Sequence, residues 1–466
     1  MIYKDLNELL NSLEGILKIN KDGLEILNKE KVVSDIIDEL AYNAALNENK
    51  DLKDISCWLI REIAYDFDII PSSIQNLYEA RSRNEYKDIT IPAINLRGLT
   101  YDLAKALIRT AKRNNSLSFI FEIAKSEIGY TQQRPAEYVA LVLAAAIKEH
   151  FEGPIFIQAD HVQVKDKNFK EDRDKEINNL KELIEEEIEA GFYNIDIDSS
   201  TLVDLNKKEV LEQQRLNFEI AAELTSFIRE KQPEGITISV GGEIGEVGGK
   251  NSTPEELRAF MEGYLRRLKD YGSQLKGISK ISIQTGTAHG GVVLPDGSVA
   301  KVKVDFDTLR NLSEIARKEY GLSGAVQHGA STLPAELFGR FPETQTVEIH
   351  LATEFQNIIY ESKHLPDELR QKMYNYIKTE LRNERKEDQT EDQFIYKTRK
   401  KAFGPFKKEL LDLPDEVKEA ISREVEEKFD FLFKKLNSVN TKELVNKYIK
   451  PQRIKAKVPH KLTELI

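Results

Sequence analysis

Eight short apolar runs alternate with longer amphipathic segments in the middle of this chain, and this alternation limits the fold more than any other feature. The runs cover residues 89–95, 118–123, 154–159, 193–198, 236–243, 280–284, 324–327 and 346–351. Helix-like segments lie between them at 100–114, 136–148, 175–190, 210–228, 254–270 and 307–319. Repeated strand-helix alternation predicts a parallel sheet, and eight uninterrupted repeats predict closure into a (β/α)8 TIM barrel.

The flanks have a different pattern. Residues 1–87 carry apolar side chains at helical spacing, and residues beyond about 360 are helical and highly charged, with several prolines as breakpoints. We therefore expect an N-terminal α-helical extension over 1–87, the barrel over 88–362 and a C-terminal helical region over 363–466. Such extensions usually pack on a barrel or contribute to assembly.

Composition excludes several classes of protein. The 466 residues carry a net charge of -11, which argues against nucleic acid as the main partner. The longest apolar run, at 138–147, is far shorter than the ~20 residues that span a membrane, and the first residues lack the pattern of a secretory signal. Cys57 is the single cysteine, so no internal disulfide can form, and a reducing, cytoplasmic location is expected.

Polar residues with metal-binding chemistry end or follow five of the predicted strands. The residues are Asp160, His161, Asp198, Glu243, His289 and His328. Because the loops after the strands of a barrel meet at one rim, we expect these side chains to converge. Three imidazoles that leave one position open are typical of catalytic zinc, which can polarise a carbonyl group.

Each of these residues also has a structural interpretation. A single imidazole near a strand end is more often a hydrogen-bonding residue than a ligand, and only the convergence of three favours a metal. Asp160 directly precedes a predicted ligand, so it can exchange a proton with an oxygen near the metal. Alternatively, Asp160 orients an imidazole that binds the metal.

Glycines are concentrated at the same rim. Examples are Gly245, Gly286, Gly290 and Gly329, and glycine lets the backbone approach a ligand and turn its N–H groups toward an anion. With Ser331 and Thr353 nearby, the expected anion is a phosphate.

Five motifs, in order between about residues 91 and 354, resemble those of the class II, zinc-dependent ketose-bisphosphate aldolases, which include the fructose- and tagatose-bisphosphate enzymes. The motifs are Gln158-Ala159-Asp160-His161, Gly242-Glu243-Ile244-Gly245-Glu246-Val247-Gly248-Gly249, Gly286-Thr287-Ala288-His289-Gly290, His328-Gly329-Ala330-Ser331 and Ala352-Thr353-Glu354.

The resemblance implies reversible aldol cleavage of a phosphorylated ketose to dihydroxyacetone phosphate and an aldehyde through a zinc-bound enediolate, in carbohydrate metabolism such as glycolysis. Zinc would bind His161, His289 and His328, and Asp160 would donate a proton to the nascent alcohol. Asp198 and Glu243 would hold a second or displaced cation. Phosphate contacts would come from Gly290, Gly329, Ala330, Ser331, Ala352 and Thr353. Homo-oligomers are usual in this family.

The sequence also departs from the family pattern. Gln158 stands where the family usually has histidine, Ala124 replaces a common serine, and Lys250-Asn251 replaces acidic residues of a loop that takes the substrate proton. Of the nearby carboxylates Glu246, Glu255 and Glu256, Glu246 is the candidate base. His350 replaces an asparagine that touches the enediolate, and we expect it to contact substrate rather than to be a fourth ligand.

These departures leave alternatives open. The leading hypothesis is a metal-dependent aldolase of altered substrate or efficiency. A second is a non-catalytic binding or regulatory homologue that lost its base. A third is another metal-dependent barrel, such as a hydrolase or isomerase. Those barrels usually present a His-x-His pair on the first strand or several carboxylate ligands, and the strand at 91–95 offers neither.

Overall fold

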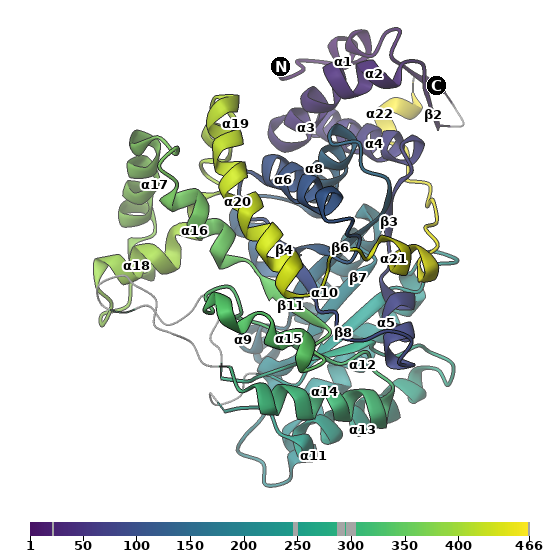
Figure 1. Cartoon of the computed structure of the whole chain (residues 1–466), viewed down its shortest axis with the longest axis vertical. Coiled ribbons are helices and arrows are strands. Elements are labelled where there is room, and N and C mark those ends of the chain that lie inside the picture. Colours follow the sequence, from purple (N-terminus) through teal and green to yellow (C-terminus); the bar gives the residue numbers. More distant parts are fainter. Residues whose placement is uncertain (21–22, 246–249, 287–293, 295–303, 465–466) are drawn as a thin grey trace.

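The computed structural model describes residues 1–20, 23–245, 250–286, 294 and 304–464. Its centre is a closed barrel of eight parallel strands surrounded by helices (Figure 1). In barrel order the strands are β4 (Ile91–Asn95), β5 (Ile120–Ala124), β6 (Gly153–Gln163), β7 (Asn194–Asp198), β8 (Ser239–Glu243), β9 (Lys280–Ile283), β10 (Ala325–Gln327) and β11 (Glu348–Leu351). Parallel pairing of β11 with β4 closes the ring, which confirms the predicted TIM barrel.

Helices cover the outside of the barrel. They are α6 (Thr100–Arg113), α7 (Lys125–Thr131), α8 (Pro135–Lys148), α9 (Asp166–Glu171), α10 (Arg173–Ala190), η2 (Ser200–Leu202), α11 (Val210–Gln213), α12 (Arg215–Lys231), α13 (Pro254–Tyr271), α14 (Phe306–Tyr320), η3 (Ala335–Leu337), α15 (Arg340–Glu343) and α16 (Thr353–Glu361). Local sequence determines where α13 begins, because Thr253 and Glu256 form a capping box and Pro254 occupies the first turn. The helix expected at 210–228 is two helices, divided at Gln214.

The first 87 residues contain strands as well as helices. The elements are α1 (Leu6–Ser12), β1 (Leu17–Asn20), β2 (Gly23–Ile26), α2 (Lys29–Lys31), η1 (Val32–Ile36), α3 (Ile37–Leu46), α4 (Lys50–Asp66), β3 (Ile69–Ser72) and α5 (Gln75–Ser82). β1 and β2 pair as an antiparallel hairpin. β3 adds to the barrel sheet by pairing with the start of β6. The expectation of a purely helical N-terminal extension is therefore wrong for these three strands. The division of the chain into three parts stays a prediction.

Asn194 stabilises the junction where β3 meets the barrel. Its side-chain amide donates to the carbonyl oxygens of Ser72 and Ile157, and its Oδ1 accepts from the backbone N–H of Ile74. The side chain is fully buried, so these hydrogen bonds replace water. β3 therefore occupies the end of the barrel opposite the carboxyl ends of its strands.

The C-terminal region is helical, as expected, and packs back over the barrel. It contains α17 (Asp367–Glu380), η4 (Arg382–Glu384), α18 (Glu391–Thr398), η5 (Arg399–Ala402), α19 (Lys407–Leu411), α20 (Asp415–Lys435), α21 (Lys442–Tyr448) and α22 (His460–Thr463). The long α20 contacts α6, and the last segment reaches the N-terminal helices, where Tyr65 donates to the carbonyl oxygen of Ile454 (Figure 1). Among the described helices, none is both long and apolar enough to cross a bilayer.

Candidate active site

A β-bulge at the end of β6 presents the two most informative residues of the sequence. Ala159 pairs with Ile195 and Val162 with Ile197, so Asp160 and His161 together face one residue of β7. His161 has a φ of 44°, a conformation that few non-glycine residues adopt. Neighbouring residues of a regular strand point to opposite faces, but at this bulge both side chains line the same cavity.

His161 lies in a cluster of four residues from four strand ends. Its Nδ1 is 3.0 Å from an oxygen of Asp198 and 3.3 Å from an oxygen of Glu243. The imidazole ring of His328 lies 4.3 Å from that of His161, centroid to centroid. The structure thus brings together four of the residues predicted as metal ligands.

The donor set fits a divalent metal ion. Ligand atoms of His161, Asp198 and Glu243 lie within 4.8 Å of one another, and so do those of Asp160, His161 and His328. Imidazole nitrogens and carboxylate oxygens are ligands that zinc takes. The predicted third imidazole, His289, lies outside the described residues, as do the candidate base Glu246 and the phosphate contact Gly290.

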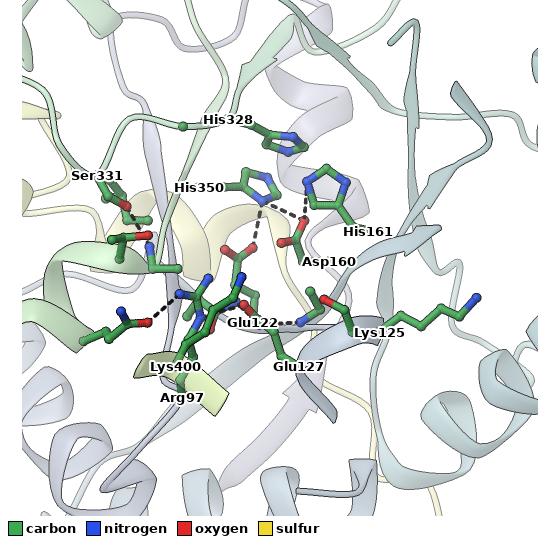
Figure 2. A pocket seen from close by; sticks show the side chains of 18 of the residues that line it. Arg97, Glu122, Lys125, Glu127, Asp160, His161, His328, Ser331, His350 and Lys400 are labelled. Atoms are coloured by element: carbon green, nitrogen blue, oxygen red, sulfur yellow. Dashed lines mark hydrogen bonds and ion pairs between the residues drawn. The ribbon is translucent and has the colours of Figure 1, made fainter. Parts of the chain in front are cut away.

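A second charged cluster lies beside the first, inside the barrel. Nδ1 of His350 is 2.9 Å from an oxygen of Glu122 and 3.1 Å from an oxygen of Asp160 (Figure 2). Its Nε2 is 2.7 Å from an oxygen of Glu348. The ring of His350 lies 4.2 Å from that of His328. The three imidazoles of His161, His328 and His350 are therefore in contact in a row.

Lys280 anchors the inner side of this cluster. Its ammonium lies 2.9 Å from Asp196 and 2.5 Å from Glu348, and it donates to the side-chain oxygen of Gln158 at 2.7 Å. Lys280 is 1% exposed, so its charge is balanced by these groups rather than by water. Gly241 makes room for the pair, since a Cβ there would lie 2.3 Å from an oxygen of Asp196.

Burial and neighbouring charges act against each other at these groups. Burial raises the pKa of Glu122 to about 7, although the charge of His350 opposes the rise. Burial would also raise the pKa of Asp160, but the charges of His161 and His350 outweigh it and lower the pKa well below its usual value. Burial alone would lower the pKa of Lys280, but the charges of Asp196 and Glu348 outweigh burial and raise this pKa above its usual value. Lys280 is therefore charged at neutral pH.

Both clusters open into one cavity of about 640 Å³ at the carboxyl ends of the strands (Figure 2). On the side of β10 and β11 its lining includes Gly329, Ser331, Ala352 and Thr353. Ser331 accepts a hydrogen bond from the backbone N–H of Ala352, directly before α16 begins at Thr353. These four residues of the predicted phosphate site thus share one wall, and Ala330 is buried without lining the cavity.

The cavity also has a cationic wall that the sequence analysis missed. Arg97 follows β4, and Lys397 and Lys400 come from α18 and η5 of the C-terminal region. Arg97 pairs with Glu127 at 2.7 Å and donates to Gln356 at 2.9 Å. Within the described part of the chain the Lys400 ammonium has no hydrogen-bond or ion-pair partner, and it lies 5.6 Å from the centroid of the Tyr130 ring. Burial and the charge of Arg97 lower the pKa of Lys400.

The sequence does contain a signal that indicates the inner cluster. Glu122, Gln158, Asp196, Lys280 and Glu348 are polar residues that alternate with apolar residues inside short strands. Such residues must face the interior once the barrel closes. No local signal exists for Lys397 and Lys400, since 46 residues or more separate them from β11.

The sequence profile described as fructose-bisphosphate aldolase class-II matches residues 75–437 of this chain. The chain belongs to the class-II fructose-bisphosphate aldolase family. The match includes the barrel, the cavity and the C-terminal residues of the cationic wall. The family assignment supports metal-dependent chemistry of the aldolase type. Among curated proteins, none matches the chain in sequence.

Several solved structures are similar to this chain at low sequence identity. A probable tagatose 6-phosphate kinase from Sinorhizobium meliloti has a TM-score of 0.54 and 13% identity, over 77% of this chain and 98% of that one. A fructose-bisphosphate aldolase from Campylobacter jejuni has a TM-score of 0.46 and 16% identity, over 80% and 98%. A fructuronate-tagaturonate epimerase from Cohnella laeviribosi has a TM-score of 0.50 and 13% identity, over 95% and 90%.

Proposed function

We propose that this protein is a zinc-dependent aldolase that reversibly cleaves a phosphorylated ketose to dihydroxyacetone phosphate and an aldehyde. One observation carries the proposal: the bulge turns Asp160 and His161 into the cavity that His328 also lines, beside Asp198 and Glu243, in a chain of the class-II aldolase family. Assembly into a homo-oligomer stays a prediction.

His161 and His328 would hold the metal together with His289, and Asp198 and Glu243 would hold it in a second position or hold a second cation. The bound metal would supply Lewis-acid polarisation of the ketone carbonyl. Asp198 also orients His161, because the contact between its carboxylate and Nδ1 leaves Nε2 of the imidazole for the cavity side.

Asp160 is the candidate proton donor to the nascent alcohol once the imidazoles beside it are neutral, because the charges of His161 and His350 otherwise hold its pKa well below the usual value. It is 6% exposed, lines the cavity and lies next to His161, so it is within reach of an oxygen held there. His350 fixes the carboxylate through the 3.1 Å contact. The base that removes the substrate proton is proposed to be Glu246.

The walls of the cavity match a substrate with anionic groups. The backbone and hydroxyl groups of Gly329, Ser331, Ala352 and Thr353 would bind one phosphate at the start of α16, where the helix dipole favours an anion. Lys400, which lies beside Arg97 without a carboxylate partner in the described residues, would bind a second anionic group. A ketose with two anionic groups fits this arrangement best.

Proton exchange at C3 of dihydroxyacetone phosphate, followed by NMR with zinc-loaded and metal-free protein, tests the proposal. A metal-dependent aldolase exchanges this proton only when metal is bound. Exchange at neither metal loading would favour the non-catalytic binding homologue instead.

Epimerisation of a keto-uronate is a second candidate. The similarity to the Cohnella epimerase covers 95% of this chain, flanks included, and Arg97 and Lys400 suit a carboxylate as well as a phosphate. Aldol cleavage followed by re-addition to the other face of the aldehyde would invert one carbon. A panel of ketose phosphates and keto-uronates, analysed for cleavage products and epimers, separates the two activities.

A further inference from the structure

Three ligand-type atoms converge at the inner end of the cavity, apart from the residues assigned to zinc by resemblance. They belong to Glu122 on β5, Asp160 on β6 and His350 on β11, and they lie within 4.8 Å of one another. Nδ1 of His350 is 2.9 Å from Glu122 and 3.1 Å from Asp160. A six-coordinate cation with bonds of about 2.1 Å holds neighbouring ligand atoms about 3.0 Å apart, which matches these spacings.

The orientation of His350 is fixed by groups behind it. Its Nε2 lies 2.7 Å from Glu348, and Glu348 is held by the buried ammonium of Lys280 at 2.5 Å. Imidazoles that bind metals commonly direct their second nitrogen to a carboxylate in this way. Nδ1 is therefore the atom that His350 presents to Glu122 and Asp160, as Figure 2 shows.

An additional oxygen faces the same cavity. Asn95 pairs with Glu122 in the sheet, is 2% exposed and lines the cavity. Its Oδ1 accepts no hydrogen bond from the residues that the structure describes, although its amide donates to Glu127. A buried carbonyl oxygen without a donor is costly unless a cation, water or ligand satisfies it.

The local charge also favours a cation. Four carboxylates surround His350, and they belong to Glu122, Asp160, Asp196 and Glu348. Among the lysines and arginines that the structure describes, Lys280 alone forms ion pairs with any of them. All four carboxylates are at most 6% exposed, so water screens their mutual repulsion poorly.

We propose that Glu122, Asp160 and His350 bind a second divalent cation, with Asn95 as a further oxygen donor. Two carboxylates, one amide oxygen and one imidazole favour Mn²⁺ over a thiolate-seeking ion. Asp160 also belongs to the cluster with His161 and His328, so its carboxylate would lie between the two ions. Ions that share a ligand in this way are about 3.5–4 Å apart.

Occupation of this site has a consequence for Asp160. A carboxylate bound to a cation is held ionised and cannot donate a proton. If Asp160 is the proton donor of the proposed aldolase, excess Mn²⁺ should slow turnover. Binding itself does not depend on that activity, so the two proposals can fail separately.

Metal stoichiometry and EPR test the inference on the full-length protein. After removal of bound metal and saturation with Mn²⁺, we expect two ions per chain by elemental analysis and an EPR spectrum of two coupled ions. Glu122→Gln and His350→Gln, each checked by circular dichroism, should bind one ion per chain and give an uncoupled six-line spectrum.

Lys125→Gln is the matched control, because Lys125 lines the same cavity but pairs with Glu176. It should keep two coupled ions. One ion per chain in the unmodified protein, or two coupled ions in Glu122→Gln, would overturn the inference, and the first result would mean that a proton on His350 bridges the two carboxylates.

Discussion

The bulge at Asp160 and His161 shows how the backbone of single residues decides which side chains reach the cavity. The sequence places both residues at a strand end, and from this their shared location could be predicted. The positive φ of His161 could not be predicted, because only a few per cent of non-glycine residues adopt such a backbone, even though histidine does so more often than most. The bulge is imposed by the pairing of β6 with β7.

Asp160→Asn should separate proton transfer from metal binding at His161 and His328. The amide keeps the size of the side chain but cannot donate a carboxylic proton. We expect aldol cleavage to fall by about 10²- to 10⁴-fold, the usual contribution of a general acid. Zinc content should stay at the unmodified level, as measured by elemental analysis. Normal turnover in this variant would refute the role of Asp160.

Glu187 on α10 has no catalytic assignment, yet its burial affects how the stability of the protein depends on pH. It is fully buried, and neither carboxylate oxygen has a hydrogen-bond partner among the described residues. Burial raises its pKa well above the usual value, and the nearby Glu186 adds to this. The folded state therefore holds a proton that the unfolded chain loses near pH 4.5.

Glu187→Gln should stabilise the protein, and increasingly so as the pH rises. With a pKa raised on folding, the contribution of the glutamic acid is fully present at low pH and is lost as the pH rises toward the folded-state pKa. Glutamine does not titrate. Urea unfolding at pH 5 and pH 8 should show a gain at pH 8 of about 1–3 kcal/mol and a smaller one at pH 5. A larger gain at pH 5 would contradict this account.

At the scale of elements, the period of the apolar residues predicts all eight barrel strands and the main helices. It does not predict β3, because residues 69–72 are a short apolar run between two helical patterns. The apolar pattern also does not predict the charged interior of the barrel, because it locates strands by their apolar residues and not by the charged residues between them. Lys280 opens β9, and only closure of the barrel shows that Asp196 and Glu348 lie opposite it.

The position of η5 depends on Gly98. A Cβ at this residue would lie 2.4 Å from the ring of Phe403. Phe403 directly follows η5, the helix that carries Lys400. Gly98→Ala should therefore shift Phe403 and destabilise the protein by about 1–3 kcal/mol in urea unfolding. Because Lys400 moves too, KM for an anionic substrate should rise more than kcat falls.

Phe403→Leu in the Gly98→Ala background supplies the control. The smaller side chain removes the overlap, so stability and KM should recover in part. If Gly98→Ala behaved like the unmodified protein in both measurements, the close packing of η5 against this loop would not hold the cationic wall in place.

At the scale of the molecule, Glu137 joins the flanks to the barrel. This residue of α8 is 1% exposed, and its carboxylate lies 2.8 Å from Lys53 of α4 and 2.6 Å from Lys407 of α19. One side chain thus links the N-terminal segment, the barrel and the C-terminal region. The sequence could not show this link, because the partners are 84 and 270 residues away.

Glu137→Gln should weaken the attachment of both flanks. It leaves the two partly exposed ammonium groups without their carboxylate, and losing a hydrogen bond to a charged group costs about 1.5–3 kcal/mol. We expect a lower unfolding midpoint and faster proteolysis of both flanks, detected by mass spectrometry. Lys50→Ala, at an exposed pair on the same helix α4, should change neither, and equal effects of the two substitutions would contradict the special role of Glu137.

The central claim is that the histidines at the strand ends hold a metal that supports aldol cleavage. Titrating metal-free protein with zinc while measuring triose phosphate release from fructose 1,6-bisphosphate and related ketose phosphates tests it directly. The account predicts cleavage of at least one of these substrates that rises with zinc up to one equivalent and falls more than about 100-fold in His328→Ala. Cleavage that is equally fast without metal, or absent for every substrate at every zinc loading, would contradict it.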